Sequence, residues 1–484
     1  MAAHAIRRAI PGAKATVLGL ATVTSVLVAA PQASADQLDD GQWWRTAMGV
    51  AELQTRGAGE GITIALIDGP IDQRVPELKG RVASTRTECL TDDGGAQKSS
   101  VAGPDAEHAT MMASLLVGSG TGTAAGGRGV AGIVPNATLR HYAVAFAGPP
   151  SAPEDLRCIL KGSSSNATDL ATARAIRQAV KDGAKIISIS LTTDYTSDYV
   201  PALLEAYKAG AIVVASTNND RRNVFWPAIG NGVVTVTHVD AKGNLDNSAP
   251  RGSSLVDLTA PGTKIAAGGW RSSGWRSDVI ADGSSQATAI TAGGLAAVWS
   301  AHPNATGNQV LQAAKDAVGV RSENGKFLTW FRRVGTGLPK STVKTESYGY
   351  GIFSPADAVK LDVEKLPDTN PLVTDRPVDD PTAAEIAQAT APSSTPSRSV
   401  TSSAGSSAAT TTAPDVAEGA ASEPTTTDSQ QSVLPWLGAG LLILLGGVGF
   451  IAWRRRSSRL NSPVNDPEAA ADGAAATTKE NTHA

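Results

Sequence analysis

The chain has 484 residues, which is enough for up to about three domains. Its net charge is −3 and aromatic residues make up only 4% of it, so the sequence gives no electrostatic basis for binding nucleic acid. Both ends carry apolar segments of the kind that meet a membrane, and these are separated from the folded part first.

Residues 1–35 are typical of a secretory signal peptide. Basic residues precede an apolar stretch at 15–30 that is short for a membrane span. Ala33-Ser34-Ala35 fits the small-x-small cleavage rule, so the mature chain is expected to begin at Asp36 with an N-terminal extension, 36–60. An uncleaved membrane anchor is the alternative.

Residues 61–365 alternate between apolar strands and helices. This pattern favours an α/β domain with a mostly parallel sheet covered on both faces, in which sites form beyond the carboxyl ends of the strands. The pattern predicts strands at 61–68, 137–146, 184–191, 211–217 and 232–239, helices at 169–183 and 201–210, and two further helices that open at His108 and Ser285.

Residues 366–432 are rich in Pro, Ser, Thr and Ala. This composition predicts a disordered linker, because it buries too little apolar surface to offset the entropy lost on ordering. Residues 433–453 carry no charge and are long enough for a transmembrane helix, although a buried core helix is the alternative. Three arginines follow at 454–456, so the positive-inside rule places the tail, 454–484, in the cytoplasm and the domain outside the cell membrane.

Cys89 and Cys158 are the only cysteines. An oxidising compartment and an even count favour a disulfide between them. Two unpaired buried thiols are the alternative.

Polar side chains stand at the ends of several predicted elements. Asp68 ends its strand, Asn218 follows another strand, and His108 and Ser285 each open a helix. These residue types can together perform acyl transfer, in which serine attacks, histidine carries the proton, aspartate orients the histidine and asparagine donates to the oxyanion. The small residues after Ser285 predict a helix packed closely beneath such a site.

Other residues compete for these roles. His141 and His238 lie inside predicted strands, and His302 stands next to a proline, positions more typical of packed or solvated side chains. Asp72 lies beyond the end of the first strand. Ser284 is the rival nucleophile.

Four segments, in this order, resemble the subtilisin-like serine proteases, or subtilases, across about residues 55–360. They read "IDGPID", "HATMMAS", "ASTN" and "GSSQA". The resemblance implies a three-layer subtilisin-like domain and a serine endopeptidase that cleaves proteins or peptides, with no cofactor or metal assigned. It places the acid at Asp68, the base at His108, the oxyanion donor at Asn218 and the nucleophile at Ser285.

The order of segments along the whole chain is similar to that of the mycosins, the membrane-anchored subtilases of type VII secretion systems. They also combine a signal peptide, an outside protease domain, a Pro-rich linker, one span and a short cytoplasmic tail. The segment before the first strand is also too short for the large folding propeptide of many secreted subtilases. The resemblance implies a single-pass cell-membrane protein associated with a type VII secretion complex.

The surroundings of the four residues differ from the family pattern. Gly69-Pro70 replaces a small hydroxyl residue and a glycine, and proline removes a backbone N–H near the acid. Ala109 replaces a glycine and Ala289 a proline. These changes open a second hypothesis, in which the chain is a catalytically weak or inactive subtilase fold that serves as a structural subunit of a secretion complex.

The expected substrate pocket is also altered. The segment Ser190-Leu191-Thr192 replaces Ser-Leu-Gly, and Thr217 replaces a glycine at the primary specificity pocket. Both changes add a side chain where the family has none. We therefore expect a preference for small residues before the scissile bond.

Overall fold

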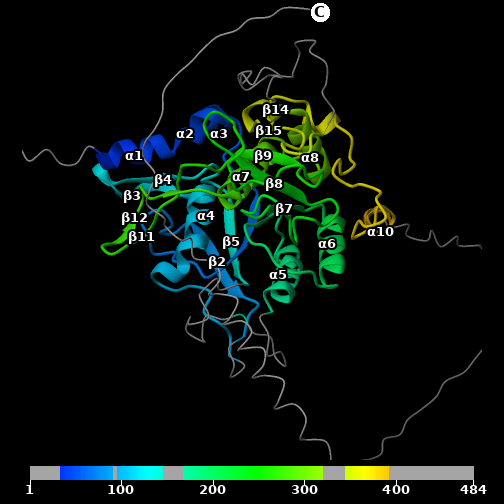
Figure 1. Ribbon diagram of the computed structural model, residues 1–484, viewed down its shortest axis with the longest axis horizontal. Coiled ribbons are helices and arrows are strands. Elements are labelled where there is room, and N and C mark those ends of the chain that lie inside the picture. Colours follow the sequence, from blue (N-terminus) through cyan, green and yellow to red (C-terminus); the bar gives the residue numbers. More distant parts are fainter. Residues whose placement is uncertain (1–32, 91–94, 145–157, 159–166, 320–343, 392–484) are drawn as a thin grey trace, which may run out of the picture. The chain divides into compact units, whose positions relative to one another are not determined.

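A nine-stranded sheet forms the middle of the domain (Figure 1). The structure, a computed structural model, describes residues 33–90, 95–144, 158, 167–319 and 344–391. All neighbouring strands are parallel except β14 and β15. In their order across the sheet, the strands are β14 (Val318–Gly319), β15 (Ile352–Phe353), β9 (Leu258–Pro261), β8 (Val234–Val239), β7 (Ile212–Ser216), β6 (Ile186–Ile189), β1 (Thr63–Asp68), β5 (Thr138–Ala143) and β2 (Val82–Thr87).

Helices cover both faces of this sheet. β6, β7 and β8 are buried at every residue, which explains their continuous apolar sequences. The structure therefore confirms a three-layer α/β domain. One face packs against α4 (Glu107–Val117), α7 (Ser284–Ala301) and α8 (Gly307–Asp316), and the other against α5 (Thr168–Lys181) and α6 (Tyr199–Lys208).

The segment before the first strand is part of the core. Trp44 and Leu53 are fully buried, and the Arg45 guanidinium donates a hydrogen bond of 2.6 Å to the carbonyl oxygen of Ala131. The predicted N-terminal extension therefore packs into the hydrophobic core on one face of the sheet. Three helices lie here: α1 (Ala33–Gly41), which begins three residues before the predicted extension, α2 (Trp43–Ala47) and α3 (Val50–Arg56).

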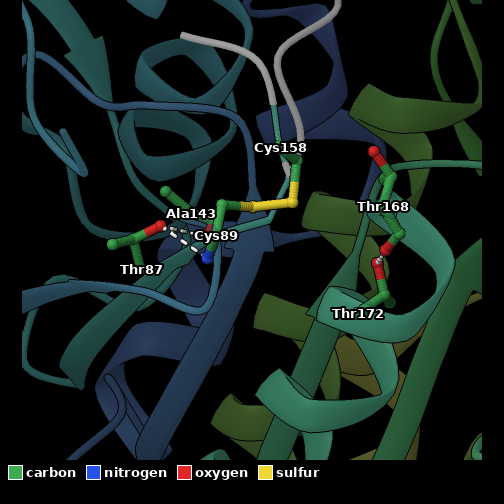
Figure 2. Close-up of a disulfide and its surroundings, with 6 residues drawn as sticks. All are labelled: Thr87, Cys89, Ala143, Cys158, Thr168 and Thr172. Atoms are coloured by element: carbon green, nitrogen blue, oxygen red, sulfur yellow. Dashed lines mark hydrogen bonds between the residues drawn. A yellow bond between two sulfur atoms is a disulfide. The ribbon is translucent and has the colours of Figure 1, made fainter. Parts of the chain in front are cut away.

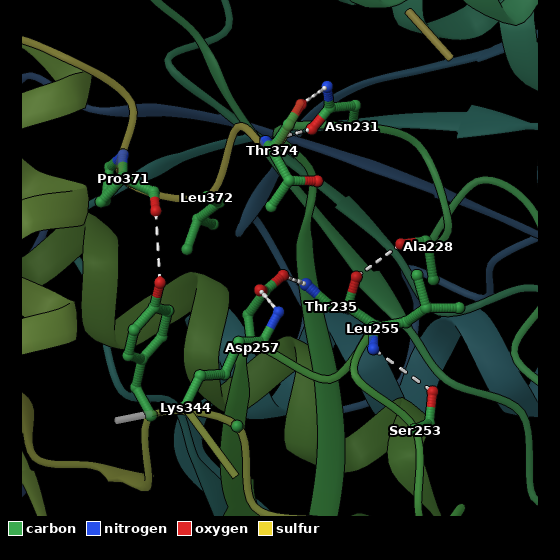
Figure 3. A network of polar contacts seen from close by, with 12 residues as sticks. Ala228, Asn231, Thr235, Ser253, Leu255, Asp257, Lys344, Pro371, Leu372 and Thr374 are labelled. Atoms are coloured by element: carbon green, nitrogen blue, oxygen red, sulfur yellow. Dashed lines mark hydrogen bonds and ion pairs between the residues drawn. The ribbon is translucent and has the colours of Figure 1, made fainter. Parts of the chain in front are cut away.

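Residues 366–391 pack on the domain, which corrects the prediction that a disordered linker begins at 366. Asn231 exchanges hydrogen bonds of 2.8 and 2.9 Å with the Thr374 backbone (Figure 3). Ile386 is buried in helix α10 (Ala383–Thr390), which starts with a capping box and packs against α6. A few buried residues and backbone hydrogen bonds order this segment although its average composition is polar.

Shorter elements complete the described part of the chain. Three two-stranded sheets pair β3 (Ser119–Ala124) with β4 (Arg128–Ala131), β10 (Ile265–Ala266) with β13 (Ile280–Ala281), and β11 (Gly269–Arg271) with β12 (Gly274–Arg276). The remaining helices are α9 (Pro355–Ala358) and the 3₁₀ turns η1 (Pro104–Ala106), η2 (Ala125–Gly127) and η4 (Val363–Lys365).

Within the described ranges, no helix has the length and apolar character needed to cross a membrane. The predicted transmembrane segment, 433–453, and residues 1–32 of the predicted signal peptide lie outside those ranges.

Candidate active site

The predicted site residues lie at the carboxyl edge of the sheet. Asp68 is the last residue of β1, which pairs with β5 on one side and β6 on the other. The strand order reverses at β1, and such reversals are where α/β sheets form their sites. The start of α7 lies at this edge as well, because Ser285 and Ser284 bond to the residues that follow β6 and β7.

Asp68 and His108 form a close pair. The distance between Asp68 Oδ1 and His108 Nδ1 is 2.7 Å, and Oδ1 also accepts the Gly69 N–H at 2.7 Å. Asp68 is fully buried, and its Oδ2 has no hydrogen-bond partner among the described residues. Pro70 has no N–H to supply one. The acid is therefore held through a single oxygen.

The imidazole of His108 has the setting of a general base. Partial burial alone would lower its pKa, but the charge of Asp68 and the hydrogen bond to it, with a further contribution from Glu107, raise the pKa above 6.5. The Asp68 bond fixes the proton on Nδ1 and leaves Nε2 to accept a proton.

This arrangement predicts a pH dependence. Only neutral imidazole accepts a proton, so kcat/KM should rise with pH through a value above 6.5, the ordinary histidine pKa. Asp68→Asn should move this limb to lower pH, because the charge that raises the pKa is lost. Peptide hydrolysis measured across the pH range checks both shifts, and an unchanged limb in the variant would contradict the role of Asp68.

Ser285 lies in the first turn of α7 and is half-buried. Its Oγ donates to the carbonyl oxygen of Ser190 at 3.2 Å, and Ser190 Oγ donates to the Ser285 carbonyl at 3.1 Å. No hydrogen bond joins Ser285 to His108 in the described part of the chain. Attack on a substrate therefore requires the Ser285 hydroxyl to leave Ser190 and donate to His108 Nε2.

Ser284 has a structural setting. Its side chain is buried, and its Oγ donates to the Thr217 carbonyl and lies 3.1 Å from Asn219 Oδ1. The Ser284 N–H donates to the same Asn219 oxygen at 3.0 Å. The preceding Gly283 has a φ of +152°, a conformation that side chains rarely adopt. These hydrogen bonds fix the position of the first residue of α7. Ser285 is therefore the more accessible of the two serines.

Two donors are available for a developing oxyanion. Asn218 is half-buried, and its Oδ1 accepts the Asp220 N–H at 3.2 Å. Its amide NH₂ makes no hydrogen bond to any other described residue. The Ser285 N–H lies in the first turn of α7, where a helix has no internal acceptor, and the helix dipole favours negative charge. Donors of these two kinds can stabilise a tetrahedral oxyanion.

The predicted substrate pocket has a buried wall and an exposed edge. Thr217 and Ser190 are buried, Leu191 is half-buried and Thr192 is exposed. The Thr193 N–H donates to the Trp226 carbonyl at 2.8 Å, which joins the segment after β6 to the segment after β7. Thr217 therefore fills space beside Ser284 and does not protrude into solvent.

The competing residues have other partners. Asp72 is ion-paired with Arg74 at 2.9 Å. His238 is fully buried near Ser248 Oγ, and His302 Nε2 bonds to a backbone carbonyl oxygen at 3.0 Å. The position of His141 inside a strand predicts an ordinary packed side chain, but the structure places it beside the turn that follows Asp68. The hydropathy pattern carried no signal for that position.

The predicted disulfide between Cys89 and Cys158 is confirmed (Figure 2). Cys89 follows the end of β2, where its N–H donates to Thr87 Oγ1 at 3.0 Å. Thr87 in turn donates to the Ala143 carbonyl at 3.1 Å, at the end of β5. The disulfide therefore lies at the edge of the sheet that carries Asp68.

An aspartate–histidine pair and a serine at a helix start, on one edge of a parallel sheet and in the order Asp, His, Ser, define a subtilisin-like α/β domain. The model of the subtilase family matches residues 59–351. The chain belongs to the subtilase family.

Three known proteins illustrate the similarity. Thermitase from Thermoactinomyces vulgaris is 27% identical over 209 residues, which cover 43% of this chain and 65% of thermitase, slightly less than two thirds of its length. Fervidolysin from Fervidobacterium pennivorans, a keratinolytic enzyme related to subtilisin, shares the fold, with a TM-score of 0.51, 20% identity and coverage of 66% of this chain and 46% of fervidolysin. MycP1 from Mycobacterium smegmatis is 20% identical, with a TM-score of 0.49 and coverage of 70% of this chain and 88% of MycP1.

Proposed function

We propose that the chain is a serine endopeptidase. Ser285 Oγ attacks the carbonyl carbon of a peptide bond while His108 Nε2 takes the hydroxyl proton. The tetrahedral oxyanion accepts hydrogen bonds from Asn218 and the Ser285 N–H. His108 then gives the proton to the leaving amine, and water, activated by the same imidazole, releases the acyl group from Ser285.

The observation that carries this proposal is the Asp68–His108 pair. A buried carboxylate at 2.7 Å from an imidazole Nδ1 orients the ring and stabilises the imidazolium formed during attack. The pair stands at the sheet edge where α7 presents Ser285. A fluorophosphonate probe tests the proposal, because it reacts only with an activated serine. Labelling of the folded full-length chain is the expected result.

The second candidate function is a structural subunit with little or no activity. Two features of the site favour a structural role. Asp68 Oδ2 lacks a hydrogen-bond partner among the described residues, and the Ser285 hydroxyl donates to the Ser190 carbonyl. A misplacement near 1 Å costs on the order of a hundredfold in rate. Absence of labelling in folded protein would therefore favour this function over the first.

The cellular setting forms part of the proposal. We place the domain outside the cell membrane, tethered by one C-terminal span, in association with a type VII secretion complex. The order of predicted segments supports it: a signal peptide, a folded domain, a polar segment, an apolar span and an arginine cluster.

Protease added to intact cells should release the folded domain by cutting after the described segment that ends at 391. The arginines at 454–456 next to the apolar stretch predict this orientation. Immunoblotting of the released fragment measures the result, with a cytoplasmic protein as the control for intact membranes. A domain that resists cleavage until the membrane is opened would reverse the orientation.

The buried Thr217 predicts selectivity for small residues, such as Ala, before the scissile bond. Its side chain occupies volume where the family has a glycine. A peptide library measures the preference at that position, and Thr217→Gly should widen it toward Phe. A wild-type profile dominated by large aromatic residues would contradict the prediction.

A further inference from the structure

The turn that follows Asp68 is held by few hydrogen bonds. The peptide group before Gly69 is fixed, because the Asp68 carbonyl accepts the Val144 N–H at 2.9 Å and the Gly69 N–H bonds to Asp68 Oδ1. The next peptide group has no N–H, because it belongs to Pro70. Its carbonyl oxygen, that of Gly69, accepts from His141 Nε2 at 2.8 Å. No other donor to this oxygen occurs in the described residues.

His141 is built into the sheet beneath the site. It lies in β5, its neighbour in the register is Leu66 of β1, and it is fully buried. A carbonyl oxygen only accepts, so the proton is on Nε2. Nδ1 has no partner in the part of the chain that the structure describes. Burial lowers the pKa of His141 to about 4, so the ring is neutral at neutral pH and acts as a single fixed donor.

We infer that His141 is a positioning residue for the catalytic acid. Gly69 has no Cβ, so its backbone dihedrals are less restricted than those of other residues, and the following proline limits them only in part. His141 holds the second group and thereby limits how far the Asp68 carboxylate can turn from His108. This inference rests on the proposed function.

The competing interpretation is purely structural: His141 satisfies a buried carbonyl and contributes only to stability. The two interpretations differ in what happens to His108. Positioning predicts that loss of the donor weakens the Asp68–His108 bond, so the pKa of His108 falls toward its ordinary value. Asp68 and Glu107 are the charged groups that raise this pKa, and both remain in a His141 variant.

The test compares His141→Met with His141→Gln in the full-length chain. The two side chains have similar length, but only glutamine keeps an N–H donor. For His141→Met we expect kcat about tenfold lower with KM unchanged, and a lower pKa for His108 in a proton NMR titration. In His141→Gln, kcat and the pKa of His108 should both stay close to their wild-type values. His302→Leu is the control: it removes an imidazole that bonds to the Val359 carbonyl and to Glu364, away from the site, and should lower only the melting temperature.

Equal His108 pKa and kcat in His141→Met and wild type would overturn the inference. The inference would also be overturned if His141→Gln folds but the pKa of His108 is no longer raised. This second outcome decides the question even if His141→Met does not fold. The NMR titration needs no turnover. A wild type without activity would therefore count against the proposed function, while the titration would still decide the role of His141.

Discussion

Ser285→Ala should lower kcat for peptide hydrolysis by about four to six orders of magnitude and abolish labelling by a fluorophosphonate. The substitution removes the only atom that can form the acyl intermediate. His108→Ala should cause a loss of similar size, because without the base the hydroxyl keeps its proton. The residues act as a unit, so the double variant should be little worse than either single variant.

The neighbouring serine provides a matched control. Ser284→Ala removes hydrogen bonds to Thr217 and Asn219, which should cost about 1 to 2 kcal/mol of stability but leave most of the labelling. Labelled peptides read by mass spectrometry distinguish the two positions. Modification of Ser284 in the wild type would reverse the assignment of the nucleophile.

Loss of the disulfide should have the largest effect on stability. The Cys89–Cys158 bond closes a loop with a sequence separation of 69, which corresponds to about 4 kcal/mol in the chain-entropy model. Replacing both cysteines by serine should therefore lower the melting temperature by roughly 6 °C for a domain of this size. Thermal unfolding followed by circular dichroism measures the change.

The single cysteine variants test whether this effect comes from the bond. Cys89→Ser and Cys158→Ser should each destabilise the chain as much as the double variant, since either one breaks the same bond. Additive losses, or free thiols in purified wild-type protein, would contradict a disulfide.

The buried part of the fold was accessible from sequence because it follows simple hydropathy patterns. The predicted strands at 211–217 and 232–239 correspond to Ile212–Ser216 and Val234–Val239. The predicted helix at 169–183 is found at Thr168–Lys181. Long apolar runs between turn residues leave few alternatives to a covered parallel sheet.

Segments that dock through backbone groups were harder to predict. Residues 366–391 are ordered by contacts such as Asn231 with Thr374 and by single buried residues such as Ile386. Contacts of this kind produce no periodic pattern of apolar residues in the sequence. The mostly polar composition of residues 366–432 as a whole also hides the few residues that are buried. The same holds for the start of the chain, where Arg45 reaches carbonyl groups of residues 131 and 132.

In the candidate active site, too, some features could be predicted from the sequence and others could not. Sequence order identified which residues stand at element ends, and the structure brings Asp68 and His108 together. The hydroxyl direction of Ser285 depends on its side-chain torsion and on the Ser190 carbonyl, which no one-dimensional pattern encodes. The anchoring of the Gly69 carbonyl by His141 requires the register between β1 and β5.

The packing of the N-terminal helices has a consequence for the order of folding. Gly41 lies against Ala266 and Ile280, and Trp43 donates to the carbonyl oxygen of Thr263, 220 positions later in the chain. These partners are made long after the helices, although Arg45 also bonds to the earlier residues Ala131 and Gly132. At about 5 to 20 residues per second, roughly 10 to 50 s of synthesis separate Gly41 from Ile280. During that interval the helices lack the contacts of Gly41 and Trp43 with residues 263–280, so this early part of the domain completes its packing late and stays more open to proteases and aggregation until then.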